Sequence, residues 1–512
     1  MASSHAEPAD EPAGAAGGAG DGTGSGETAA SHPGHGVVFP RGTDGRRSTT
    51  AVGRAVVAAA LQNVDPAGAR AARQESGWRS NYLLHFRRLV EAGVGSPEAA
   101  VGMARAGLDA LRGQLMVKSV DGEVPLADWE ASRLPEIAQV RGSAEPETEL
   151  SVPYRGARLR GDELRRQVDR WVEAGVAEPT VAEAVGAVLD HPEWLRLEGR
   201  TVAVLGAGAE MGPLIPLLRW GARVAAVDLP RPAIWSRVLG AARKSAGQLV
   251  LPSAKAEADS ESAGADLLAD APTVAAWLAD VAGHDQLVVG NYVYADGAVN
   301  VRVSTAVDVL STRLVAERPD TALGFLATPT DVFAVPGDAV RQSTAAYEQR
   351  SKTAKILGRP LRTLSGGRLL RRAYVPGADP GISDSLVAQQ GPNYALAKRL
   401  QRWRATVARR DGVLVSMNVA PPTRTRSVVK NRALAAAYAG AHRFGVEVFE
   451  PSTSNVLMAA LLVHDLHTGG GPRHPEPWQD EAYAAVHGGL WRLPYAPRSV
   501  LGLAALMGAA RR

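Results

Sequence analysis

The stretch RTVAVLGAGAEMGPLIPLLRWGARVAAVDLPRP, residues 200–232, decides the fold. Its TVAVLG segment is a short continuous apolar run, which is typical of a strand buried on both faces. Three glycines follow, Gly206, Gly208 and Gly212, and then a helical segment and a second apolar run that ends at Asp228. A strand, a glycine loop, a helix, a strand and an acid in this order indicate the opening of a nucleotide-binding α/β unit.

Each of these residues has an expected role at the nucleotide. Gly206 allows a tight turn, Gly208 lets the backbone approach a phosphate or a carboxylate, and Gly212 permits close packing of the helix on the sheet. The helix offers free amides and the positive end of its dipole to an anion, and Asp228 accepts hydrogen bonds from ribose hydroxyls. Glu210 opposes this interpretation because its carboxylate repels a diphosphate, whereas it disturbs the sulfonium of S-adenosylmethionine less.

The composition restricts the class of protein. The chain has 512 residues, 45% of them hydrophobic, a net charge of +4 from 57 basic and 53 acidic residues, and no cysteine. This charge balance gives no reason to propose a nucleic-acid partner. The lack of cysteine excludes disulfides, a thiolate nucleophile and cysteine metal sites, and it fits the cytoplasmic localisation that we predict. No apolar run is long enough to predict a transmembrane helix.

The sequence divides into four predicted parts. Residues 1–48 are rich in Gly, Ala, Ser and Pro and are predicted to be a disordered tail. Residues 49–198 predict a mainly helical N-terminal domain, which either supports the next domain or covers a substrate pocket formed with it. Residues 199–470 alternate strand and helix patterns and predict an α/β domain with a doubly wound, mostly parallel Rossmann-like sheet. Residues 471–512 predict a loop and a short helix that packs on the core.

Polar side chains that follow predicted strands are candidates for the site, because ligands of an open α/β sheet bind outside the carboxyl ends of its strands. Such strands are predicted near residue 266 and at 285–292, 321–327, 412–421 and 446–451. The candidates are Asp270 and Asn291 for the nucleotide, and Tyr292, Tyr294, Asp296 and Arg424 for the substrate. Arg424 opens a basic cluster with Arg426, Lys430 and Arg432, which either grips a phosphate or carboxylate or begins a solvated helix.

Tyr394 and Lys398 form a YxxxK pattern on a predicted helix, and the strand after this helix ends in NVAPPTRT. With these features, residues 200–450 resemble the short-chain dehydrogenase/reductase family. The resemblance implies that Tyr394 exchanges a proton with the reacting oxygen and that Lys398 lowers the tyrosine pKa and holds the nicotinamide ribose. A phenol with a pKa of about 10 is a poor base at neutral pH, and a nearby ammonium favours the phenolate. Otherwise Tyr394 and Lys398 belong to a solvated helix face.

The resemblance also implies further site residues. It places Asp270 against adenine, and it requires a serine upstream of Tyr394, for which Ser383 and Ser385 are the candidates. The sequence separation between Asn291 and Tyr394 is longer than the family usually has, so an insertion is expected between them.

These observations favour an oxidoreductase that transfers a hydride between NAD or NADP and a small carbonyl or alcohol substrate. An S-adenosylmethionine-dependent methyltransferase is the alternative, although Val204 stands where such enzymes usually carry an acid. A non-catalytic nucleotide-binding protein is the third interpretation. No metal site is predicted, since His464, Asp465 and His467 are more typical of a helix-end cluster. The sequence leaves a homo-oligomer open.

Overall fold

The computed structural model describes residues 35–510 and contains a central sheet of seven strands in the order β14-β11-β10-β7-β8-β9-β4. These strands are β4 (Glu136–Arg141), β7 (Arg200–Leu205), β8 (Arg223–Val227), β9 (Gln248–Ser253), β10 (Gln286–Asn291), β11 (Ala322–Ala327) and β14 (Val415–Val419). All neighbours pair in parallel except β4, which runs antiparallel along β9. The parallel strands have the Rossmann order, so the predicted fold class is confirmed.

The central strands form because both of their faces are covered. Residues 201–205 of β7 and 224–227 of β8 are buried throughout, as a parallel sheet between two helical layers requires. In the strand register, Leu205 lies beside both Val227 and Asn291. The strand order reverses between β7 and β10, so a ligand crevice is expected outside the ends of these two strands.

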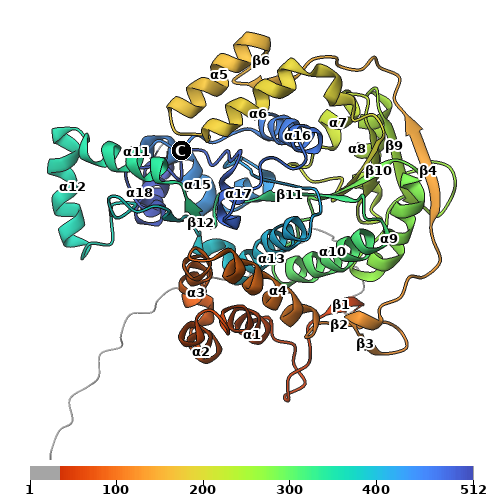
Figure 1. Cartoon of the computed structure of the whole chain (residues 1–512), viewed down its shortest axis with the longest axis horizontal. Helices are drawn as coiled ribbons and strands as arrows, with labels where there is room; N and C mark the ends of the chain where they lie inside the picture. The colour runs from red at the N-terminus through yellow and green to blue at the C-terminus, as the bar shows by residue number, and fades with distance from the viewer. Residues whose placement is uncertain (1–34, 511–512) are drawn as a thin grey trace, which may run out of the picture. The chain divides into compact units, whose positions relative to one another are not determined.

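Helices cover both faces of the sheet (Figure 1). One face carries α9 (Leu267–Ala282), α10 (Ala298–Glu317) and α13 (Gly391–Arg410), with α1 (Thr49–Leu61), α3 (Trp78–Gly93) and α4 (Pro97–Arg112) beyond them. The other face carries α5 (Gly161–Glu173), α6 (Pro179–Asp190), α7 (Leu214–Arg219), α8 (Pro232–Arg243) and α16 (Pro451–His467). None of the helices that the structure describes is both long and apolar enough to cross a membrane.

Two N-terminal helices begin directly after a serine that caps them. α1 follows Ser48, whose Oγ accepts a hydrogen bond from the amide of Ala51 at 3.1 Å. α4 follows Ser96, whose Oγ accepts from the amide of Ala99 at 3.2 Å, and Pro97 is its first residue. A serine that satisfies an otherwise free amide, followed by proline in the first turn, is a strong start signal.

Other local predictions are wrong. The segment near residue 266 is the start of α9 and not a strand, because Asp266 caps the helix by accepting from the amide of Leu268 at 2.9 Å. The third parallel strand is instead β9. No strand is assigned at residues 446–451, where the structure describes one isolated bridge between Thr423 and Phe449. Part of the predicted disordered tail, residues 1–34, lies outside the described residues, but Gly36–Val38 form β1, which pairs with β2 (Met116–Lys118).

The residues before the glycine loop, which are predicted to be mainly helical, also form several strands. β4 extends the central sheet at its β9 edge, and β5 (Ser151–Tyr154) pairs with β6 (Ala157–Arg160). β2 also pairs with β3 (Glu123–Pro125). In β4 only Ala138 is buried, so this edge strand lacks the apolar run by which the inner strands are recognised.

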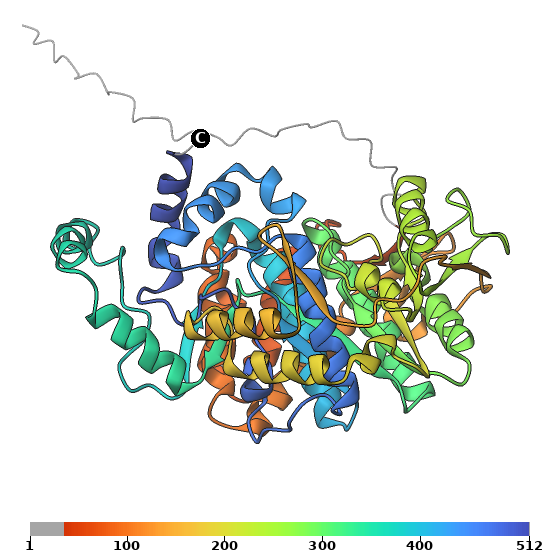
Figure 2. The same ribbon diagram turned by 90° about the horizontal axis from the view of Figure 1, so that it is seen from above.

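The insertion expected between Asn291 and Tyr394 lies between β11 and α13. It contains β12 (Val332–Val335), α11 (Gly337–Glu348), α12 (Lys352–Leu364) and β13 (Gly381–Asp384), and β12 pairs with β13. In Figures 1 and 2, α12 lies at one side of the folded part, away from the central sheet. The inserted segment therefore leaves the sheet at the end of β11 and returns at the start of α13.

The C-terminal helix α18 (Pro497–Ala509) packs against α15 (Arg432–Ala441). A Cβ atom added at Gly440 would overlap the carbonyl oxygen of Ala504, and one added at Gly508 would overlap that of Ala436. The two helix backbones therefore touch at these glycines.

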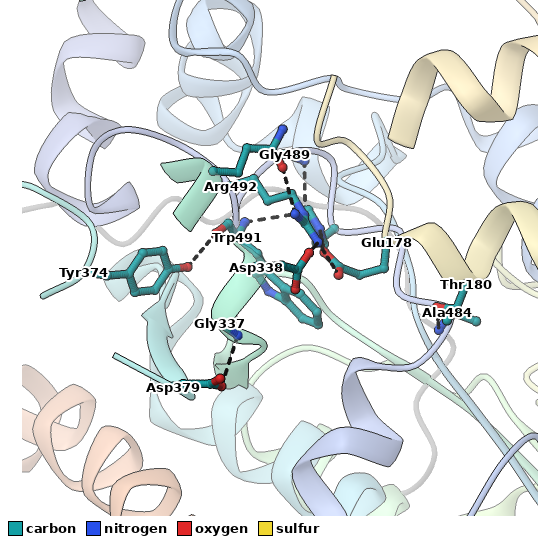
Figure 3. A network of polar contacts seen from close by, with 12 residues as sticks. Glu178, Thr180, Gly337, Asp338, Tyr374, Asp379, Ala484, Gly489, Trp491 and Arg492 are labelled. Carbon is teal, nitrogen blue, oxygen red and sulfur yellow. Dashed lines mark hydrogen bonds and ion pairs between the residues drawn. The ribbon is translucent and has the colours of Figure 1, made fainter. Parts of the chain in front are cut away.

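A buried polar network joins the start of α6 to the chain before α18 (Figure 3). Arg492 donates to both carboxylate oxygens of Glu178, at 2.8 and 2.6 Å, and to Asp338 of α11 at 2.7 Å. The fully buried His487 lies 2.9 Å from the same glutamate. Nearby, the hydroxyl of Tyr374 donates to the carbonyl of Trp491 at 2.7 Å. This network fixes the N-terminal residues, the insertion and the C-terminal segment to one another.

Candidate functional site

The glycine loop turns sharply at the end of β7. Gly206 has a φ of +85°, a conformation that favours glycine. A Cβ atom there would lie 3.0 Å from the carbonyl group of Tyr292, so the loop also touches the chain that leaves β10. Gly206 is therefore required both for the turn and for the contact between the ends of β7 and β10.

The amides of the loop are partly used inside the chain. The amides of Gly206 and Ala207 donate to the carbonyl of Val227, at 2.8 and 3.1 Å. The amide of Gly208 donates to Oδ2 of Asp228 at 2.7 Å, and Oδ1 accepts from the amide of Leu229. A carboxylate can accept about four hydrogen bonds, so Asp228 still has acceptor positions for ribose hydroxyls. Burial raises the pKa of Asp228.

The amides beyond Gly208 are the ones that an anion can use. Among the residues that the structure describes, the amides of Glu210 and Met211 donate no hydrogen bond. The helix contributes less than the sequence suggested, because α7 begins only at Leu214 and has six residues. A Cβ atom at Gly212 would make only ordinary contacts, the nearest to the carbonyl oxygen of Ala209 at 3.5 Å, so the expected close packing at Gly212 is not seen. Two amides of the loop, those of Glu210 and Met211, are therefore left for a bound anion, and no long helix stands behind them.

Glu210 has a basic partner that the sequence did not reveal. Nε of Arg426 lies 2.8 Å from Oε1 of Glu210, and the backbone amide of Arg426 donates to Oε2 at 2.8 Å. Arg426 begins α14 (Arg426–Lys430), which follows β14. The ion pair compensates the carboxylate that would otherwise repel a diphosphate, and it places the segment after β14 against the glycine loop.

Tyr394 and Lys398 lie one turn apart on α13, beside the end of β11. Nζ of Lys398 donates to the carbonyl of Leu326 at 3.3 Å and to Oε1 of Gln401 at 3.0 Å. Burial lowers the pKa of this lysine to about 8. Burial raises the pKa of Tyr394, while a hydrogen bond with the hydroxyl of Thr328 acts in the opposite direction. Thr328 immediately follows β11.

The hydroxyl beside Tyr394 is thus that of Thr328 and not a serine shortly before it. Ser383 lies in β13 and Ser385 follows it, both buried, with their Oγ atoms 3.5 Å apart. Within the described residues, neither serine forms a hydrogen bond with Tyr394. The insertion explains the difference, because it separates the end of β11 from α13 and carries the two serines with it.

A second polar link joins α13 to the end of β10. Nε2 of Gln401 lies 3.5 Å from Oδ1 of Asn291, and both side chains are buried. Because Gln401 also accepts from Lys398, the polar groups of α13 connect the ends of β10 and β11. The sequence identified Asn291 by its place after a strand, but it gave no signal for Gln401.

A buried ion cluster orients α13. Asp331 accepts from Nη2 of Arg399 at 3.1 Å and from Nη1 of Arg402 at 2.7 Å, and the side chains of all three are at most 5% exposed. Arg402 also pairs with Glu481. Because Asp331 lies three residues after Thr328, this cluster holds the tyrosine helix and the threonine in a fixed relation.

The other predicted residues are dispersed. The ring of Tyr292 folds back over Gly290 and Gly324, which are paired in the sheet, while the hydroxyl of Tyr294 donates to Asp296 at 2.8 Å at the surface. Tyr294 also makes an edge contact with Tyr394, with ring centroids 6.2 Å apart.

Three further polar residues that the sequence singled out, Arg424, Asp270 and Asp465, have neighbours that the sequence did not reveal. Arg424 points to Glu450, 3.6 Å away. Asp270 lies at a kink in α9, where burial and the charge of Asp266 raise its pKa. Asp465, beside His464 on α16, accepts hydrogen bonds from Ser416 and Asn418 of β14. This residue therefore ties α16 to the central sheet.

Known proteins offer only distant likenesses. No family model matches the chain, and no curated protein matches its sequence. An oxidoreductase of the short-chain dehydrogenase/reductase family from Burkholderia thailandensis is 17% identical, with 52% of this chain and 85% of that chain covered and a TM-score of 0.29. An A-type ketoreductase from a modular polyketide synthase is 16% identical and an A1-type ketoreductase 14%, each with 53% of this chain and 47% of that chain covered and a TM-score of 0.30. We therefore base the function on the contacts of this chain.

Proposed function

We propose that this chain is a nicotinamide-dependent oxidoreductase that interconverts a carbonyl and an alcohol. The observation that carries the proposal is the group of Thr328, Tyr394 and Lys398 beside the carboxyl end of β11. This position adjoins the end of β10, where the strand order reverses and a ligand crevice is expected.

Tyr394 is the proton donor and acceptor in this proposal. Its raised pKa keeps the phenol protonated at neutral pH, so it is suited to donate a proton to the oxygen of a carbonyl substrate. The side chain of Thr328 lowers the pKa of Tyr394, against the effect of burial, and so favours the phenolate after the transfer. Lys398, protonated below a pH of about 8, adds a positive charge on the same helix face one turn away.

The glycine loop would hold the cofactor. The amides of Glu210 and Met211, which donate no hydrogen bond within the described chain, would be available to its diphosphate. Asp228 has acceptor positions left for ribose hydroxyls, and Arg426 compensates Glu210. NAD or NADP, when bound, supplies or takes up the hydride. The compensation of Glu210 removes the feature that favoured S-adenosylmethionine over a dinucleotide, so methyl transfer is not proposed.

The proposal is tested with Tyr394→Phe, Thr328→Val and, as a matched control, Tyr347→Phe on α11. Oxidation of the reduced nicotinamide is followed with a panel of aldehydes and ketones, and cofactor affinity is measured by calorimetry. We expect Tyr394→Phe to lower kcat by about 10²–10⁴-fold, as removal of a general acid does, with unchanged cofactor affinity. Tyr347→Phe should leave turnover unchanged. Full turnover by Tyr394→Phe would exclude the assigned acid.

A further inference from the structure

The proposed catalytic group adjoins a pocket that its chemistry does not require. Oγ1 of Thr328 lies 2.8 Å from Oγ1 of Thr330, and Thr330 lines a pocket enclosed by α15, α18 and the segments around residues 386, 446 and 490. Tyr438 of α15 lines the same pocket and lies near enough to Tyr394 for the two phenols to influence each other's ionisation. Thr330 therefore connects the pocket wall to Thr328, although Thr328, Tyr394 and Lys398 are not among the residues that line the pocket.

The wall of this pocket is almost wholly apolar. Aliphatic and aromatic side chains make most of it, among them Leu386, Leu434, Phe444, Leu493, Leu501 and Ala504. Its polar side chains are Thr330, Ser385, Tyr438 and Arg498. Arg498 does not offer a free charge, because its Nη1 donates to Oδ2 of Asp384 at 2.9 Å. A ligand with a charged or strongly hydrated group in this pocket would lose its water without gaining a partner.

Rigid helix contacts set the width of the pocket. Two of its walls, α15 and α18, touch through Gly440 and Gly508, where any side chain would overlap a carbonyl oxygen of the opposite helix. Leu434 and Ala437 come from one helix, and Leu501 and Ala504 from the other. An apolar slot between two helices in backbone contact selects ligands by shape and apolar area.

We propose that this pocket binds the hydrocarbon part of the substrate, so that the enzyme acts on a long-chain or similarly apolar carbonyl or alcohol with its oxygen at Thr328 and Tyr394. The role as a substrate pocket rests on the proposed function, whereas the apolar specificity does not. Each methylene buried in such a slot strengthens binding about fourfold.

The test combines turnover with a binding measurement that needs no turnover. Propanal, hexanal and decanal are compared as substrates, and the affinity for 1-decanol is measured by calorimetry without cofactor. Ala504→Phe fills the pocket from α18, and Ala509→Phe, on the exposed side of the same helix, is the matched control. Leu434→Phe gives a smaller change from α15 in case Ala504→Phe does not fold.

We expect kcat/KM to rise from propanal to decanal and 1-decanol to bind. Ala504→Phe or Leu434→Phe should weaken decanol binding at least tenfold and lower kcat/KM for decanal more than for propanal, and Ala509→Phe should change neither binding nor turnover. Equal kcat/KM for the three aldehydes, or decanol binding that the filled pocket does not weaken, would overturn the inference. Decanol binding that Ala504→Phe abolishes, with no turnover of any aldehyde, would contradict the proposed function and leave the apolar specificity of the pocket standing.

Discussion

Burial alters the ionisation of the two residues that define the site. It raises the pKa of Tyr394 and lowers the pKa of Lys398 to about 8. Both are protonated at neutral pH, and Lys398 loses its charge as the pH rises through about 8. We therefore predict that the rate of carbonyl reduction falls over this range.

The variant Lys398→Arg tests this assignment, because a guanidinium stays charged far above this pH. Rates measured from about pH 6 to 10 should show the fall displaced upward in Lys398→Arg. A fall at the same pH in both proteins would mean that another group causes it.

The pair of Glu210 and Arg426 gives a second prediction at the residue scale. Arg426→Gln leaves the carboxylate of Glu210 uncompensated in the glycine loop and should weaken the binding of a dinucleotide. The effect should be less than about tenfold, because exposed pairs of this kind contribute about 0.2–1 kcal/mol and the Arg426 side chain is 65% exposed.

A double-mutant cycle separates charge from structure in this pair. Calorimetric affinities for the double variant Glu210→Gln/Arg426→Gln should return close to those of the unchanged protein. If the double variant binds the dinucleotide as weakly as Arg426→Gln alone, Arg426 does not act on cofactor binding by compensating the charge of Glu210.

At the scale of elements, the contact between α15 and α18 predicts unequal effects of two glycine substitutions on one helix. Gly508→Ala places a methyl group against the carbonyl oxygen of Ala436 and should destabilise the protein by about 1–3 kcal/mol. Gly502→Ala is the matched control, since no atom lies within 4 Å of its added Cβ, and it should be neutral or stabilising by up to about 1 kcal/mol. Denaturant unfolding measures the free energy of unfolding of both variants. Equal changes would contradict the close contact of α15 and α18 at Gly508.

The sequence could predict those elements whose signals are local. The runs of β7, β8, β10 and β11 are mostly apolar, because these strands are buried on both faces. β14 is equally buried, although Ser416 and Asn418 interrupt its apolar residues. β9 escaped prediction although it is buried, since Pro252 interrupts its apolar run. The start of α9 resembled a short strand because two leucines directly follow its capping acid, Asp266.

The site was predictable only where its residues follow a strand or share a helix. Asn291 and the pair of Tyr394 and Lys398 were found in this way. Thr328 was missed because the insertion separates it from α13. Arg426 was named as part of a basic cluster, but its pairing with Glu210 was missed because the two residues lie 216 positions apart. Contacts of this range are set by the order of the strands, which no local pattern encodes.

At the scale of the whole molecule, the network of Glu178, His487 and Arg492 makes stability depend on pH. Burial alone would raise the pKa of Glu178, but hydrogen bonds and charges from His487 and Arg492 outweigh it and lower the pKa to about 2. Burial lowers the pKa of His487 below its ordinary value of 6.5. In both cases the unfolded chain binds the proton first as the pH falls.

Stability should therefore decline below about pH 6.5 because of His487, and further below about pH 4.5 because of Glu178. The midpoint of thermal unfolding, measured between about pH 7.5 and 5, should fall less steeply in His487→Gln, whose side chain does not titrate. Identical slopes for the two proteins would show that other groups cause the decline.

The central claim is that the loop after β7 and the group of Thr328, Tyr394 and Lys398 serve one nicotinamide dinucleotide. The most direct measurement is calorimetric titration of the whole protein with NADH, NADPH and S-adenosylmethionine in separate experiments, repeated with Gly208→Arg. The account predicts that at least one reduced nicotinamide binds, that Gly208→Arg abolishes this binding and that S-adenosylmethionine does not bind. Binding of S-adenosylmethionine alone would contradict it.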